Sequence, residues 1–210
     1  MQGYLDNLDL FTLAVIFVTL IISITLHEMM HAFTSFWLGD DTAEREGRIS
    51  FNPLRHVDLF TTILLPLITL ILFKIPFLAA KPVPFNPDRV KFEEFGAALV
   101  GLAGPATNFL LAAAGAAFLK LFGADLGQTG LDILGIFVVI NTGLFVFNMI
   151  PIPPLDGSRL LYAFAPEPIQ RFMASLEQFG IFIILGLVLM VPAFGDLLSH
   201  LNSVVVDFLI

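Results

Sequence analysis

The chain has 210 residues, of which 57% are hydrophobic and only 13% are charged, and its mean hydropathy is +0.91. Globular domains carry about a quarter charged residues, so this composition predicts a single membrane-embedded domain over residues 1–210. The net charge of −8 includes no basic patch, which argues against nucleic-acid binding, and the absence of cysteine excludes disulfides and thiolate metal ligands.

The first long apolar run extends over residues 10–38 and contains the sequence HEMMH at positions 27–31. On a helix, His27 and His31 project from one face and can share a metal ion, while Glu28 lies on the adjacent flank, close enough to take a proton from a metal-activated water. Ionisable groups are costly in lipid and mark a functional site, although two histidines satisfied by hydrogen bonds within a bundle are the alternative. The run therefore predicts metal-dependent hydrolysis within the bilayer. Residues 1–9 lack Lys and Arg, so we expect no cleavable signal peptide.

The region between the first and second predicted spans is mixed. Residues 48–52 are typical of a strand, and the pattern FNPxR at 51–55 recurs at 85–89, which favours two similar strand ends that could pair. Residues 59–80 are apolar but contain two prolines and a lysine, which disfavours a straight spanning helix. Basic residues flank this segment on both sides, so we expect a re-entrant hairpin; an ordinary span is the alternative.

Three further apolar runs, at 97–121, 131–150 and 172–191, are long enough to span a membrane. Lys and Arg gather in three connecting segments and are absent from 122–130, which predicts that the basic segments face the cytoplasm. We therefore expect an all-α polytopic protein of the cytoplasmic membrane, with about four to five transmembrane helices and a small strand or re-entrant element. Its site should lie nearer the cytoplasmic side.

The second span contains the sequence GPATN at positions 104–108. Small side chains at helical spacing form a stripe suited to close helix packing, and for Asn108 within this stripe a packing role and a site role are equally favoured. The stripe comprises Ala97, Gly101, Asn108, Ala112 and Ala116.

Two histidines leave a tetrahedral catalytic site one protein ligand short. Asp156 stands out because three prolines break the helix before it, and broken backbone at membrane depth is tolerated where it lines a cavity. Its alternative role is to cap the helix that starts near Gly157. The other candidates lie in polar, basic segments where a solvated loop charge is favoured; they are His56, Asp58, Glu93 and Glu94.

Asn148 lies near the end of the apolar run at 131–150, eight residues before Asp156. Its side-chain amide can donate to a developing oxyanion. Asn141 shares its helix face one heptad earlier, so a structural hydrogen bond is the competing interpretation.

The sequences HEMMH, GPATN and NMIPIPPLDG, in this order, resemble the motifs of the site-2 protease family of intramembrane zinc metalloproteases. The resemblance is strongest to the short form that lacks appended PDZ or CBS domains. It implies a catalytic core at about 10–165, transmembrane proteins as substrates within the lipid bilayer, and strand structure that guides the substrate. It leaves His56 with either a site-facing or a loop-anchoring role. The implied roles are binding of one zinc ion by His27, His31 and Asp156, activation of water by Glu28, and assistance at the scissile carbonyl by Asn148.

Two functions from other classes compete with proteolysis. A metal transporter should carry polar residues along a path to both membrane faces, whereas here they cluster toward one side. An inactive relative that acts as a membrane chaperone should have lost Glu28 or a metal ligand, and all four residues are present.

Overall fold

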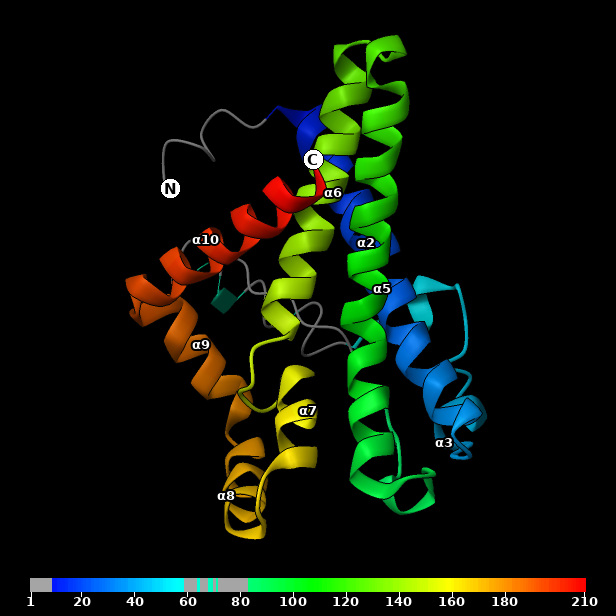
Figure 1. Cartoon of the computed structure of the whole chain (residues 1–210), viewed down its shortest axis with the longest axis vertical. Coiled ribbons are helices and arrows are strands. Elements are labelled where there is room, and N and C mark those ends of the chain that lie inside the picture. Colours follow the sequence, from blue (N-terminus) through cyan, green and yellow to red (C-terminus); the bar gives the residue numbers. More distant parts are fainter. Residues whose placement is uncertain (1–8, 59–63, 65–67, 70, 72–82) are drawn as a thin grey trace.

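The structure, a computed structural model, describes residues 9–58, 64, 68, 69, 71 and 83–210. Three long helices form its centre: α2 (Leu10–Trp37), α5 (Glu93–Phe122) and α6 (Gln128–Asn148). Figure 1 shows that α2 and α6 run in the same direction and α5 runs in the opposite one. The C-terminal parts of α2 and α6 therefore point toward the same end of the bundle, as a site shared by residues 27 and 156 requires.

In the described part of the chain, these three helices are long and apolar enough to cross a membrane. The predicted span at 172–191 is not one continuous helix, because α8 (Glu167–Glu177) and α9 (Gly180–Met190) meet at an angle of 77°. The break lies beside Gly180, where an added Cβ would lie 2.5 Å from Cδ of Pro154. If α8 and α9 together form one bent span, the described part of the chain has four candidate spans. The remaining helical elements are α3 (Thr42–Arg45), η1 (Pro53–Arg55), η3 (Pro87–Arg89), η4 (Gly123–Asp125), α7 (Gly157–Phe164) and α10 (Pro192–Leu209).

Helix α2 turns a polar stripe inward and apolar side chains outward. Large residues such as Phe17 and Ile22 are exposed, which suits a lipid-facing surface. The inward stripe consists of buried residues four positions apart, which stack on one face of the helix. They are Thr19, Ser23, His27, His31 and Ser35.

The small-residue stripe of α5 is confirmed as a packing surface. All five of its members are buried, and Ala112 and Ala116 form a cluster with Val138 of α6. An added Cβ at Gly115 would lie 3.0 Å from Val138 and 3.1 Å from the ring of Phe137, so α6 approaches α5 closely where α5 carries no side chain.

The predicted strands do not form among the described residues at 48–52 and 83–86. Their backbone donors have other partners: the N–H of Arg48 donates to the carbonyl of Ala43, and the N–H of Asn86 donates to the carboxylate of Asp40. Both FNPxR copies instead form short 3-10 turns, η1 and η3. The predicted re-entrant hairpin at 59–80 lies almost entirely outside the described residues.

The segments after α2 and before α5 are tied together, and this sets how the two helices sit. The N–H of Lys91 donates to the carbonyl of Leu38, and Arg89 pairs with Asp41 at 3.3 Å. Asp40, which is fully buried, accepts hydrogen bonds from the hydroxyl of Ser35, from the N–H and hydroxyl of Thr42, and from the N–H of Asn86. The ends of α2 and α5 are thereby held side by side.

Candidate metal centre

Three potential ligand atoms converge where α2 meets the turn between α6 and α7. The Nε2 atoms of His27 and His31 are 3.0 Å apart, and the Oδ2 atom of Asp156 lies 3.1 and 3.3 Å from them. Ligands bonded to a tetrahedral zinc at 2.0–2.1 Å are separated by about 3.3 Å. The donor set and its spacing therefore fit one zinc ion, and among the described histidines and acids only these three form such a group.

The other nitrogen of each ring is held by a partner on α5. Nδ1 of His27 donates to Oδ1 of Asn108 at 2.6 Å, and Nδ1 of His31 donates to the backbone carbonyl of Val100 at 2.7 Å. With a hydrogen on Nδ1, each ring keeps the Nε2 lone pair free for a metal. Pro105 lies within the same helix and has no N–H, so the carbonyl of Gly101, next to Val100, lacks its usual helical donor.

Gly104 provides the space for this arrangement. A Cβ added there would lie 2.3 Å from Nε2 of His31 and 2.5 Å from Nε2 of His27. A side chain at this position would therefore occupy the small volume beside both nitrogen atoms that a shared ion needs.

Asp156 lies at the N-cap position of α7, but its side chain makes no capping hydrogen bond. The carboxylate instead faces the two histidines, so the capping interpretation does not describe its main contacts. Burial alone would raise the pKa of Asp156, but His31 and His27 beside it hold the pKa below its usual range. Gly157 is required at the next position, because a Cβ there would lie 2.3 Å from the carbonyl oxygen of Met149.

Glu28 is partly buried beside the cluster, within electrostatic range of the three ligand residues and of Arg48. Arg48 is only 1% exposed, and its Nη1 donates to the carbonyl of Arg55. Burial lowers the pKa of Arg48, and the carboxylates of Glu28 and Glu46 oppose that shift. The sequence placed Arg48 in a strand and gave no signal that its charge lies near the site.

The other candidate ligands lie elsewhere. His56 is buried, and its Nε2 donates to the carbonyl of Ser50, which supports the loop-anchoring interpretation. Glu93 and Glu94 are exposed at the start of α5, and Asp58 is not part of the cluster.

Asn148 and Asn141 both lie on α6 but differ in their contacts. The side-chain amide of Asn148 donates to the carbonyl of Leu144 in its own helix. Asn141 is fully buried and accepts a hydrogen bond from Asn108, so a polar contact connects α6 with α5.

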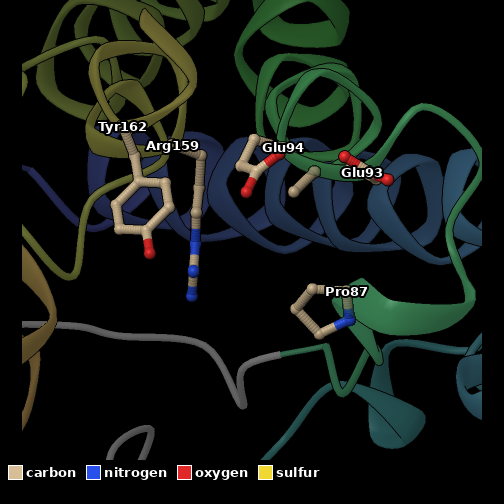
Figure 2. Close-up of a pocket in the computed structure, with 6 residues that line it drawn as sticks. Pro87, Glu93, Glu94, Arg159 and Tyr162 are labelled. Carbon is tan, nitrogen blue, oxygen red and sulfur yellow. The ribbon is translucent and has the colours of Figure 1, made fainter. Parts of the chain in front are cut away.

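A cavity of about 430 Å³ lies along the groove between α5 and α7 (Figure 2). Ala97 in its lining lies seven positions before Gly104, which places the cavity about 10 Å from the cluster along α5. Between the cavity and the cluster, α5 packs closely on the start of α7, because a Cβ added at Gly101 would lie 2.9 Å from Cβ of Arg159 and 3.0 Å from the carbonyl oxygen of Asp156. The lining residues are Pro87, Glu93, Glu94, Ala97, Arg159 and Tyr162.

The chain is similar to curated bacterial proteins. It is 37% identical over 186 residues to "Putative zinc metalloprotease YwhC" of Bacillus subtilis (strain 168), which covers 85% of this chain and 81% of that protein. It is 32% identical over 179 residues to "Putative zinc metalloprotease Rip2" of Mycolicibacterium smegmatis, covering 82% of this chain, and spans only 65% of that protein. It is 28% identical over 169 residues to the protein of the same name in Mycobacterium tuberculosis (strain H37Rv), which covers 80% of this chain and 64% of that protein. No family model matches the chain, and no solved structure matches it.

Proposed function

The chain belongs to the zinc metalloprotease family that includes YwhC, and on this premise we propose that it is an intramembrane protease of the site-2 type. The observation that carries the proposal is the convergence of two histidines and one aspartate, 3.0–3.3 Å apart, at a helix long and apolar enough to cross a membrane. The names of the relatives favour proteolysis over metal transport or a chaperone role.

In this proposal His27, His31 and Asp156 hold one zinc ion, through the Nε2 atoms and the carboxylate. Zinc, when bound there, would supply a Lewis acid that polarises a carbonyl oxygen and makes a water molecule more acidic. The side chain of Asp156 is 22% exposed whereas both histidines are 8% exposed, so the cluster is more open on the aspartate side. Water and substrate approach from that side.

Glu28 acts as the proton carrier of the reaction. It takes a proton from the attacking water and passes it to the amine that leaves when the peptide bond breaks. Asn148 would turn its amide from Leu144 toward the substrate and donate to the oxyanion. This second role requires a side-chain rotation, because the amide is engaged with its own helix in the structure.

The substrate in this proposal is a transmembrane segment of another protein in the same bilayer. Its peptide bonds are shielded by helical hydrogen bonds, so part of the segment must unwind before it reaches Glu28. The cavity between α5 and α7, about 10 Å from the cluster along α5, offers room for part of an unwound segment. Basic residues at 45–55 and 159–171 support a cytoplasmic location for this end of the bundle in the cell membrane.

Substitution of Glu28 by glutamine tests the proposal. Glu28→Gln should lower cleavage of a transmembrane substrate by about 10²–10⁴-fold, because general acid–base catalysis contributes that much. The zinc content of the purified protein should stay at the wild-type level, since Glu28 is not one of the three ligands. Glu44→Gln, an exposed glutamate on α3, is the matched control and should cleave normally. Near-full activity of Glu28→Gln would overturn the proposed mechanism.

A further inference from the structure

A chain of buried side-chain amides connects the candidate ligand His27 with helix α6. Oδ1 of Asn108 accepts from His27, Nδ2 of Asn108 donates to Oδ1 of Asn141 at 3.1 Å, and Nδ2 of Asn141 donates to the carbonyl of Phe137 at 2.9 Å. Both asparagines are 0% exposed, so no solvent competes for these contacts. The chain joins α2, α5 and α6.

The directions of these hydrogen bonds follow from the main chain at one end. The carbonyl of Phe137 can only accept, so the NH₂ group of Asn141 must face it and the amide oxygen must face Asn108. That oxygen also only accepts, so Asn108 must present its NH₂ group to it and its own oxygen to His27. The carbonyl of Ser23, 3.5 Å from Nδ2 of Asn108, favours the same orientation.

The last link is the imidazole. An amide oxygen facing Nδ1 of His27 requires a hydrogen on that nitrogen, which leaves the Nε2 lone pair directed at His31 and Asp156. We propose that Asn108 and Asn141 are positioning residues of the metal centre, which hold His27 in the ring orientation and tautomer that a metal ion needs. The effect on metal binding rests on the proposed function, whereas the predicted tautomer of His27 follows from the hydrogen bonds alone.

His31 has the same relation to the backbone carbonyl of Val100, which no side-chain substitution removes. The amide chain is therefore the part of the support that mutation can test. Outer partners of metal-bound histidines typically contribute 10–100-fold to metal affinity.

The first measurement is zinc affinity, by competition with a chromophoric chelator on the purified full-length protein. Asn108→Leu and Asn141→Leu should each weaken zinc binding by about 10–100-fold. Asn108→Asp keeps an acceptor for Nδ1 and should bind zinc nearly as well as wild type. Thr142→Val is the matched control, because the equally buried Thr142 hydroxyl bonds only to carbonyls of its own helix. It should leave the affinity unchanged.

Three results would overturn the inference: wild-type affinity in Asn108→Leu or Asn141→Leu, equal losses in Asn108→Asp and Asn108→Leu, or an equal loss in Thr142→Val. The second measurement uses metal-free protein labelled with ¹⁵N-histidine, with the His27 signals identified by their loss in His27→Gln. NMR should show the hydrogen of His27 on Nδ1 in wild type and its redistribution in Asn141→Leu. A wild-type His27 whose Nδ1 carries no hydrogen would refute the positioning role even in a fully active protease. Conversely, the expected tautomer in a protein that does not cleave would leave this inference standing while the proposed function fails.

Discussion

Gly104→Ala is the substitution for which the structure makes the sharpest prediction. The new Cβ would lie 2.3 and 2.5 Å from the two Nε2 atoms, whereas ordinary van der Waals contact begins at 3.4 Å. Each imidazole, or the turn of α5 that carries the methyl group, must therefore move by about 1 Å. Zinc–ligand distances tolerate only about 0.2 Å, so at least one nitrogen ligand should be lost.

The expected effect on zinc binding exceeds that of losing an outer partner, which is about 10–100-fold. We expect Gly104→Ala to weaken zinc binding by more than about 100-fold and to abolish proteolysis with it. The helix itself should persist, because alanine favours helix over glycine by about 0.5–1 kcal/mol.

The assay is zinc per protein by mass spectrometry after dialysis against a weak chelator, with helix content followed by circular dichroism. Gly135→Ala is the control, since Gly135 lies within α6 and a Cβ there meets nothing within 4 Å. It should keep its zinc and gain slightly in stability. Wild-type zinc content in Gly104→Ala would refute the claim that a methyl group at this position displaces a nitrogen ligand.

Three further predictions concern the fold around the site. Asp40→Ala should lower the free energy of unfolding by about 2–4 kcal/mol in chemical denaturation, because buried donors lose their acceptor; an unchanged midpoint would contradict this. Burial would raise the pKa of Asp40, but hydrogen bonds from its neighbours outweigh this and lower it. Its contribution is therefore fully present above the unfolded pKa of about 3.9 and is lost as the pH falls through the lowered value, so Asp40→Asn should lack this acid dependence. Single cysteines replacing Arg45 and Arg89, whose side chains are 69% and 53% exposed, should react with an impermeant thiol reagent from the same side of the membrane. Labelling from opposite sides would contradict the proposed arrangement.

The ligand cluster was predictable because its signals are local. The i, i+4 spacing puts two histidines on one helix face, and the prolines before Asp156 mark a break where a carboxylate can turn inward. The structure places these three residues together, and their binding of a metal ion stays a prediction. The catalytic roles of Glu28 and Asn148 stay predictions.

The residues that hold the three candidate ligands in place were harder to predict from the sequence. Val100 contributes through its backbone carbonyl and Gly104 through the absence of a side chain, so neither has a residue type that indicates metal chemistry. The strands predicted at 48–52 and before Asn86 do not form among the described residues for a related reason. A local pattern cannot show that Ala43 accepts from the N–H of Arg48 and that Asp40 accepts from the N–H of Asn86. The bend near Gly180 lies where the chain passes close to Pro154, which is 26 positions earlier and so gives no local signal.

The inward stripe of α2 has opposite effects on insertion of the helix into the bilayer and on its packing against the other helices. A lone α2 would expose two hydroxyl-bearing positions, Thr19 and Ser23, and both imidazoles to lipid before α5 and α6 cover them. Replacing the stripe with leucine would ease insertion but remove the surface by which the helices recognise one another. The residues that make α2 costly to expose to lipid on its own are thus the ones that pack it against α5 and α6.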